Sequence, residues 1–204
     1  MNPVSPYKNV EQYTKVLLEP YQMNSDLDNN LKLNLKKKIE KKCNKNGYVD
    51  FVYKLLNYKD GKMYAENLSG NALYDIKYLC RLCLPIENSI IVAQVVVINH
   101  ELVVTVNGPI MTFIPRNKID TTIWNISENF KHNKKENTYL KVKDYVLVQL
   151  TNEKINKGDG HIKTMGTLLD LASEKQVKDY YENITEMDVN EIGITNNEES
   201  NFII

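Results

Sequence analysis

Five short runs rich in β-branched residues, separated by tight turns, constrain the fold of this chain more than any other feature. The clearest turns are Asn107-Gly108-Pro109 and Gly158-Asp159-Gly160. The five runs are Ile90 to Ile98, Leu102 to Val106, Ile110 to Ile114, Leu140 to Leu150 and His161 to Leu169. Five strands with one long insertion between the third and the fourth are typical of an OB-fold, a five-stranded Greek-key barrel.

The insertion, Arg116 to Thr138, is polar but holds a small group of apolar residues. These are Ile119, Ile123, Trp124, Ile126 and Phe130. We expect one short helix in this segment, which would close the end of the barrel and bury Trp124.

The first half of the chain predicts a small sheet with one helix. A loosely alternating strand, Val10 to Glu19, stops at Pro20, because proline cannot donate to a strand ladder. A helix follows, begun by an N-cap among residues 24–26 and closed by Gly47. Its apolar stripe recurs every four residues, at Leu27, Leu31, Leu35, Ile39 and Cys43. We expect the helix to lie across one side of the sheet, with Cys43 in the core.

Three further β-rich runs complete this half. Tyr48 to Tyr58 and Met63 to Leu68 flank a turn that contains Asp60-Gly61, and they predict a hairpin. A third run, Leu73 to Leu84, stops at Pro85. The sequence therefore predicts an α+β protein in three parts. These are an N-terminal β-α-β-β-β domain over residues 1–85, an OB-fold barrel over residues 86–172, and an acidic, partly disordered tail over residues 173–204.

The charge of the chain is balanced overall but not along its length. It has 26 basic and 26 acidic side chains, which excludes a global polycation. From Ser173 onward eight acids stand against two lysines, so the tail is acidic and the body before it is basic. The stretch Thr195 to Asn201 has little apolar surface to offset its ordering entropy, and we expect it to be mobile. The tail could cover the basic body or contact another protein.

The sequence holds no recognisable catalytic or metal-binding constellation. Cys80 and Cys83 have the CxxC spacing of zinc and redox sites, but at this odd offset a strand points the two thiols to opposite faces. We interpret these cysteines and Cys43 as reduced and structural. No Ser or Cys nucleophile stands near a histidine at a spacing typical of a catalytic site. We therefore expect the three histidines at the surface, namely His100, His132 and His161. We therefore expect a non-catalytic protein without a metal or cofactor.

No apolar run reaches the roughly 18 residues that a membrane-spanning helix needs. The first residues are polar and unlike a signal peptide. We expect an intracellular protein with no membrane partner.

Alternating basic side chains suggest a contact with nucleic acid. Two lysines share a face of the fourth run, and a histidine and a lysine share a face of the fifth. If the two strands are neighbours, these residues form one basic patch, extended by two more at the end of the third run. The six residues are Lys141, Lys143, His161, Lys163, Arg116 and Lys118. Such a patch binds RNA in a salt-sensitive way. A solvated lysine face explains the pattern equally well, because the lysine-rich composition fits an A/T-rich genome.

Four motifs in the right order resemble the RNA polymerase stalk subunit family, which includes the seventh subunit of eukaryotic RNA polymerase II and its archaeal counterpart. The resemblance extends from about residue 17 to residue 172. The motifs are Leu18-Glu19-Pro20 with Gly47-Tyr48-Val49, Gly70 to Tyr78 running into Leu84-Pro85, Val106-Asn107-Gly108-Pro109, and Ile162 to Leu168. The chain departs from the family at Ile86 to Asn88, and it has no aromatic residue at Glu101 to Val104, where the family often has one. We therefore expect a weak and mostly electrostatic contact with RNA.

The resemblance implies a non-catalytic polymerase subunit that supports initiation. Its N-terminal tip would dock on the polymerase core, and strands between Leu73 and Val97 would hold a partner like the fourth subunit. The barrel would contact nascent single-stranded RNA. The docking residues implied at the tip are Pro20, Tyr21, Met23, Tyr58, Asp60 and Gly61. The location would be the nucleus in a cellular organism, and the host cytoplasm or virion in a large DNA virus.

A free-standing OB-fold RNA-binding protein, acting in translation or RNA handling, is the alternative. A stalk protein has an exposed apolar docking patch and needs its partner, whereas a free binder is a well-behaved monomer. An enzyme is a distant third hypothesis.

Overall fold

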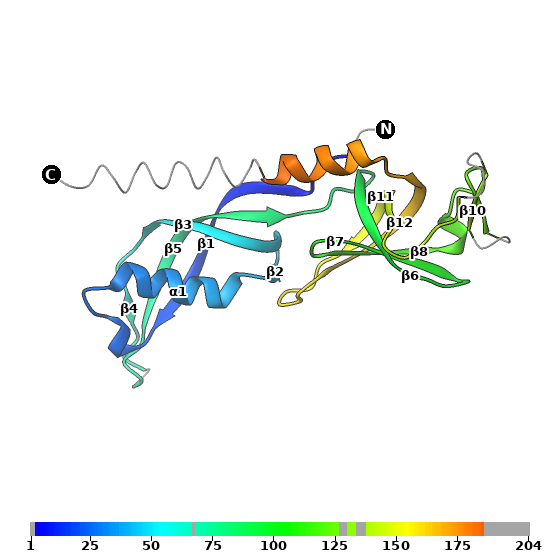
Figure 1. Ribbon diagram of the computed structural model, residues 1–204. Coiled ribbons are helices and arrows are strands. Elements are labelled where there is room, and N and C mark those ends of the chain that lie inside the picture. Colours follow the sequence, from blue (N-terminus) through cyan, green and yellow to red (C-terminus); the bar gives the residue numbers. More distant parts are fainter. Residues whose placement is uncertain (1–2, 67, 127–129, 134–137, 186–204) are drawn as a thin grey trace.

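The computed structural model describes residues 3–66, 68–126, 130–133 and 138–185 (Figure 1). It is an elongated α+β molecule, with a helix-covered sheet at one end and a barrel at the other. The class is as expected. Within the described residues, no helix is long and apolar enough to cross a membrane.

The N-terminal half is an antiparallel sheet with the order β1-β5-β3-β2, and a short strand, β4, also pairs with β5. A 3-10 turn, η1, and one α-helix, α1, lie between β1 and β2. The elements are β1 (Tyr7–Leu18), η1 (Pro20–Gln22), α1 (Leu27–Ile39), β2 (Lys42–Asn44), β3 (Gly47–Tyr58), β4 (Lys62–Met63) and β5 (Ala72–Cys83).

The helix α1 covers one face of this sheet. Residues of β5 alternate between buried and half-buried, so Ile76 and Tyr78 point towards α1 and their neighbours point away. Leu31 and Leu35 of α1 are fully buried against them. The apolar stripe read from the sequence therefore points to the core, as expected.

The expected extension of the helix to Cys43 and its cap at Gly47 are both wrong. The helix ends at Ile39, and Lys41 takes a left-handed backbone conformation with φ of 58°. Cys43 lies in β2, which pairs with the start of β3, and Gly47 is the first residue of β3. The two-residue turn before Gly47 makes a hairpin at this point, which replaces the last expected turn of the helix.

The expected hairpin of Tyr48 to Tyr58 with Met63 to Leu68 is also wrong. The strand β3 ends opposite Ile76 of β5. The two residues of β4 then continue along the same edge of β5, opposite Leu73 and Ala72. Both β3 and β4 therefore pair with the long central strand β5, and they do not pair with each other.

The second half is a closed five-stranded barrel with the order β11-β12-β8-β7-β6. Neighbouring strands are antiparallel except β8 and β12, which run parallel. This is the strand order of an OB-fold, so the expected barrel is confirmed, although its fourth strand begins at Tyr145 and not at Leu140. The strands are β6 (Ile90–Ile98), β7 (Leu102–Asn107), β8 (Ile110–Pro115), β11 (Tyr145–Lys154) and β12 (Ile162–Leu171).

The insertion between β8 and β11 does not form the expected α-helix in its described residues. It holds a 3-10 turn, η2 (Arg116–Lys118), and a small hairpin of β9 (Trp124–Asn125) and β10 (Lys131–His132). Trp124 is fully buried, as expected, and its indole N–H donates to the Leu169 carbonyl at 3.0 Å. The hairpin of β9 and β10 thus contains the buried Trp124, which was expected in a helix.

The expectation that His132 lies at the surface is wrong. Its side chain is buried against the Trp124 ring, 5.1 Å between ring centroids, and its Nε2 lies 3.0 Å from an Asp170 carboxylate oxygen. Asp170 belongs to β12, far away in the sequence, so the local pattern around His132 could not reveal this contact. His100 and His161 are exposed, as expected.

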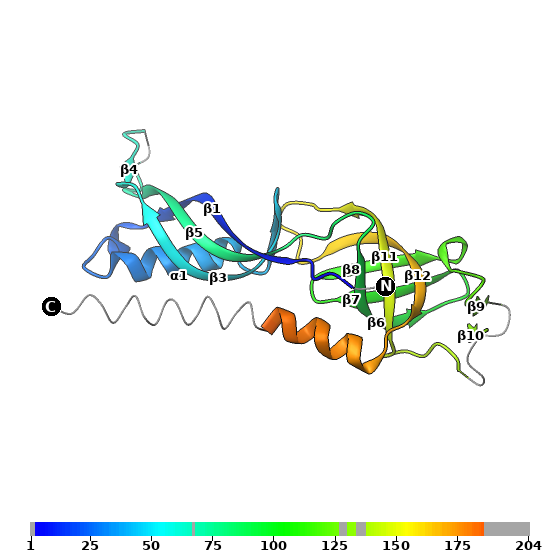
Figure 2. The same cartoon turned by 90° about the horizontal axis from the view of Figure 1, so that it is seen from above.

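A helix over residues 174–185, which the sequence pattern did not predict, follows the barrel. A capping box stabilises its first turn. The backbone N–H of Gln176 donates to Ser173 Oγ, and the backbone N–H of Ser173 donates to Gln176 Oε1. Tyr180 is buried against Val92 and Leu147 on the outside of the barrel. Figure 2 shows this helix lying along the barrel and pointing towards the N-terminal sheet. The stretch expected to be mobile, residues 195–201, lies outside the described residues.

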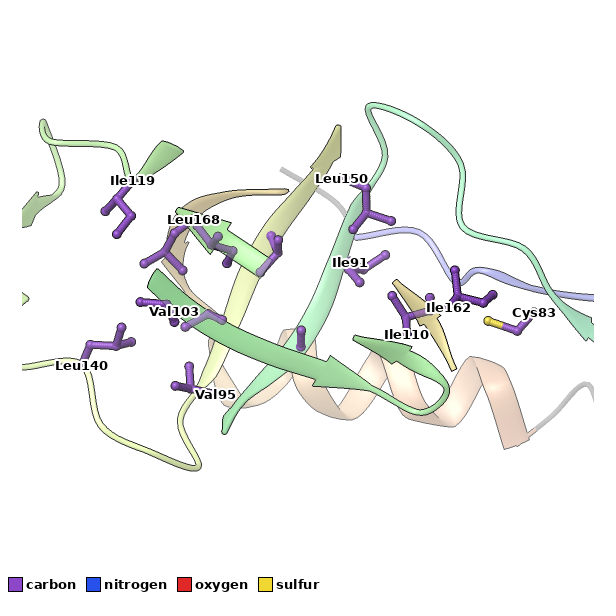
Figure 3. Packing of buried hydrophobic residues seen from close by; sticks show 14 of the residues in the cluster. Cys83, Ile91, Val95, Val103, Ile110, Ile119, Leu140, Leu150, Ile162 and Leu168 are labelled. Atoms are coloured by element: carbon purple, nitrogen blue, oxygen red, sulfur yellow. The ribbon is translucent and has the colours of Figure 1, made fainter. Parts of the chain in front are cut away.

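The two halves share one hydrophobic core. Tyr7, Cys43, Tyr48 and Cys83 come from the N-terminal strands, yet they pack in the same cluster as the barrel residues. Cys83 lies beside Ile110 and Ile162 in Figure 3. The loop between β11 and β12 also reaches β2, where the Cys43 N–H donates to the Asp159 carbonyl at 2.8 Å. The barrel is therefore fixed against the sheet on two sides of the junction.

Candidate functional site

The structure does not assemble the six basic residues into one patch. Lys141 and Lys143 do not lie on a strand but in the exposed turn before β11, where Lys143 has a φ of 79°. The N–H of Lys143 donates to the Val95 carbonyl. His161 and Lys163 lie at the other end of the same strand pair, because Lys163 is opposite Lys154 at the end of β11.

The six residues instead form two groups. A strand of ten residues is about 30 Å long, so the ends of β11 are too distant for one binding patch. Arg116 and Lys118 follow β8, where Ile119 bridges to Leu168 near the end of β12. They therefore lie towards the end that carries Lys141 and Lys143. His161 and Lys163 lie at the opposite end, next to the N-terminal sheet.

The barrel carries an apolar face that the reading of the sequence missed. Val104 of β7, Phe113 of β8 and Met165 of β12 form one row across three neighbouring strands. All three alternate with buried residues, so they point outward, and Met165 is 45% exposed. Lys163 lies two residues before Met165 on the same face. The expectation that the barrel lacks an aromatic platform was based on β7 alone, and Phe113 of β8 supplies one.

The six tip residues are brought together at the end of the sheet farthest from the barrel (Figure 1). Pro20 packs on Gly70, where an added Cβ would lie 3.2 Å from its ring. Gly61 packs on the Tyr74 ring in the same way, and Tyr58 meets that ring edge-on at 6.2 Å between centroids. Tyr21, Met23 and Asp60 belong to the two loops held by these contacts.

Large apolar side chains are exposed at this tip. Tyr21 is 73% exposed and Leu68 is 97% exposed. Met63 and Tyr64, on and after β4, are also more than half exposed. Such a group on one end of a protein is typical of a protein-binding surface. The sequence pattern predicts a hairpin strand over residues 63–68 and does not indicate that their side chains are exposed.

A partly buried charge network lies near the junction of sheet and barrel. The carboxylate of Asp50 accepts hydrogen bonds from Lys41 Nζ and from Arg81, whose Nε lies at 2.9 Å. Burial raises the pKa of Asp50, but these hydrogen bonds and positive charges outweigh burial and hold that pKa below its ordinary value. The Arg81 guanidinium also lies over the Tyr7 ring, 5.2 Å from its centroid. The network ties β3 and β5 to β1.

Comparison with known proteins identifies the group to which the chain belongs. No protein-family model matches it. A protein of Acanthamoeba polyphaga mimivirus, named "Putative DNA-directed RNA polymerase subunit", is 32% identical to it over 166 residues, which is 81% of this chain and 83% of the relative. The chain belongs to this family of DNA-directed RNA polymerase subunits. The resemblance to polymerase subunits is confirmed, with a viral relative.

In this polymerase subunit, the three cysteines are buried and free. Cys80 packs between the sheet and α1, whereas Cys83 packs in the core shared with the barrel, so the two thiols do point to opposite faces, as expected. Burial raises the pKa of Cys80 to about 12, and burial and the nearby Asp50 raise that of Cys83. Among the described residues, no group of His, Cys, Asp and Glu side chains could hold a metal ion.

Proposed function

We propose that the chain is the stalk subunit of a viral multisubunit DNA-directed RNA polymerase. The observation that carries this proposal is the combination of a helix-covered sheet and an OB barrel on one core, in a chain whose relative is a viral polymerase subunit. The subunit has an accessory, non-catalytic role and supports initiation. It works where the viral polymerase works, in the host cytoplasm or the virion.

The tip docks on the polymerase core in this proposal. The exposed Tyr21 and Leu68 bury apolar surface against the core enzyme, because a fully buried aromatic or leucine side chain contributes roughly 2 kcal/mol. The double variant Tyr21→Asp with Leu68→Asp is expected to lose the large polymerase subunits on affinity purification. Val142→Asp is the matched control, because Val142 is 53% exposed and lies at the far end of the barrel.

A partner like the fourth subunit binds the face of the sheet that α1 leaves uncovered. Tyr13 of β1 is 76% exposed on this face, and Lys77 of β5 lies opposite it. A groove of about 440 Å³ runs between Tyr13, Asp75 and Asn57. Its lining includes Asp75, Ile76 and Lys77 of β5, the strand that leads to the barrel.

Nascent single-stranded RNA contacts the barrel, weakly and in a salt-dependent way. The face of Val104, Phe113 and Met165 provides a stacking surface, and Lys163 beside it provides a charge for phosphate. The second group, Arg116, Lys118, Lys141 and Lys143, is a separate contact. Phe113→Ala is expected to weaken RNA binding by about 1 to 3 kcal/mol, the range for removal of one stacked base.

Affinity purification of the tagged chain from infected cells, with mass spectrometry of the bound proteins, tests the proposal. We expect the large polymerase subunits and one small partner. Recovery of ribosomal proteins or RNA without polymerase would instead support the free-standing RNA-binding protein. Loss of initiation activity on depletion, with restoration by the purified chain, tests the functional part.

A further inference from the structure

A lysine-lined groove lies at the junction of the sheet and the barrel. It has a volume of about 400 Å³ and is enclosed by the end of α1, by β1 and β2, and by the loop between β11 and β12. Five of the residues that line it are lysines, namely Lys15, Lys38, Lys42, Lys45 and Lys157. None of its lining residues is acidic.

The charges of this groove are largely left without a neutralising carboxylate. Lys38 Nζ donates to the Lys15 carbonyl, and Lys42 Nζ donates to the Lys37 carbonyl at 3.2 Å. These contacts orient the ammonium groups but leave the charge in place. Of the five, only Lys15 forms an ion pair in the described part of the chain, with Asp75 at 3.9 Å. An anion in the groove would therefore relieve the repulsion between several lysines.

Asp159, an acidic residue next to the groove, is held by its own loop. The Asp159 carboxylate accepts a hydrogen bond from the Asn156 amide at 3.0 Å. Its backbone carbonyl accepts the N–H of Cys43, and these bonds fix the loop against β2. Lys157 and Lys45 are exposed on the two sides of this contact. The junction thus holds lysines from both halves of the molecule at one groove.

The groove lies near one of the two basic groups on the barrel. The Cys43 thiol lies 3.6 Å from the His161 carbonyl, so His161 and Lys163 lie at the same junction. Lys163 in turn flanks the face of Val104, Phe113 and Met165. Basic residues therefore occur on the barrel face, on the loop and at the end of α1.

We propose that this groove binds the sugar-phosphate backbone of a single-stranded nucleic acid as it leaves the barrel face. The ligand class rests on the RNA contact proposed above, and the groove extends that contact onto the N-terminal half. Besides lysines, the lining holds the exposed Asn46, whose side-chain amide suits phosphate and sugar oxygens, and Gln12 and Asn44, whose amides hydrogen-bond to each other. Its apolar lining comes from Ile39, Cys43, Tyr13 and Tyr78.

The test measures binding of labelled oligouridylates to the full chain, one of about 8 nucleotides, within the reach of a single OB-fold, and one of about 20. The groove variant carries Lys42→Gln, Lys45→Gln and Lys157→Gln. We expect it to bind the long strand roughly tenfold more weakly. The slope of log affinity against log salt should fall by about 2, since each lost phosphate contact contributes about 0.7 for single strands. Binding of the short strand should not change.

The matched control removes the same charge elsewhere, with Lys32→Gln, Lys37→Gln and Lys62→Gln, and should leave both strands unaffected. Phe113→Ala should weaken the binding of both oligouridylates. If it does so while the groove variant binds the long strand normally, the groove proposal is overturned and the barrel contact stands. If neither strand binds the unaltered chain, the RNA contact fails together with the groove, although polymerase copurification can still succeed.

A peptide of residues 186–204, which has five acids and no basic residue, gives the last arm. It is added to a chain that ends at residue 185. The contrary outcome is peptide binding that depends on Lys42, Lys45 and Lys157, while binding of the long RNA strand does not depend on them. In that case the groove holds the acidic end of the chain, and the nucleic-acid proposal is overturned.

Discussion

The side-chain amide of Asn107 donates a hydrogen bond to the Tyr180 hydroxyl, with 2.8 Å between the two heavy atoms. The same amide donates to the Val92 carbonyl of β6. Asn107 and Tyr180 are both buried, so one side chain at the end of β7 joins the helix over residues 174–185 to two strands of the barrel.

Loss of the Tyr180 hydroxyl should loosen this helix. Tyr180→Phe keeps the buried ring but leaves one amide hydrogen of Asn107 without its acceptor, which costs about 1 to 3 kcal/mol of unfolding free energy. Urea denaturation measures the loss. Tyr181→Phe is the control, because Tyr181 lies on the same helix but is more exposed. An equal effect of both changes would refute the role of the Asn107 contact.

Gly108 is required because Tyr7 lies over it. A Cβ on Gly108 would lie 2.3 Å from the Tyr7 hydroxyl oxygen, and its φ is 53°. Gly108→Ala should therefore destabilise the chain by about 2 to 3 kcal/mol, through the clash and the backbone strain. In a Tyr7→Phe background the clash is absent, so the cost should fall to about 1 kcal/mol.

Thermal denaturation of the four chains of this double-mutant cycle measures the coupling. Gly158→Ala is the control, because Gly158 also has a positive φ but has open space around its Cβ position. A Gly108→Ala cost that is the same in both backgrounds would show that Tyr7 does not cause it.

The Asp50 network should make stability fall in acid. The folded pKa of Asp50 lies below its unfolded value, near 3.9, so its contribution is complete above that pH and is lost as pH falls through the folded pKa. Asp50→Asn should reduce the dependence of the unfolding free energy on pH in the acidic range. It should also cost about 3 kcal/mol at neutral pH, because the Arg81 guanidinium loses its ion pair with Asp50. Denaturant midpoints between about pH 3 and 7 measure both effects, with Asp60→Asn, at an exposed position, as control.

The cysteines should react only when the chain unfolds. With a pKa of about 12, the Cys80 thiol forms roughly three orders of magnitude less thiolate near pH 8 than an ordinary cysteine does. Maleimide labelling followed by mass spectrometry should give three modifications in urea and almost none without it. Rapid labelling of the folded chain would contradict the buried placement of these thiols.

Local pattern was sufficient for most of the barrel. The alternation of buried and outward residues in β6, β7 and β8, with the Asn107-Gly108-Pro109 turn, predicts three strands in the places where the structure has them. The same pattern contains the outward position of Phe113, because Thr112 and Ile114 on either side are buried. That face could have been predicted from the sequence by following which side of each strand points outward.

Other features depend on contacts between distant residues. Lys141 and Lys143 alternate as on a strand, but the residue between them, Val142, is 53% exposed and no core face exists there. The four-residue period of α1 continues to Cys43, but pairing of β2 with β3 ends the helix four residues earlier. The lysine groove is formed by segments more than a hundred residues apart, so no local pattern could show it.

The core around Tyr7, Cys43 and Cys83 is shared by the sheet and the barrel, so bending between them would expose buried apolar side chains. The strand β5 runs from the tip, beside Met63, to Cys83 in that core. A force applied at Tyr21 or Leu68 would therefore rotate the sheet and the barrel together as one rigid body. If the tip docks as proposed, the angle at which it binds sets the direction in which the barrel face points.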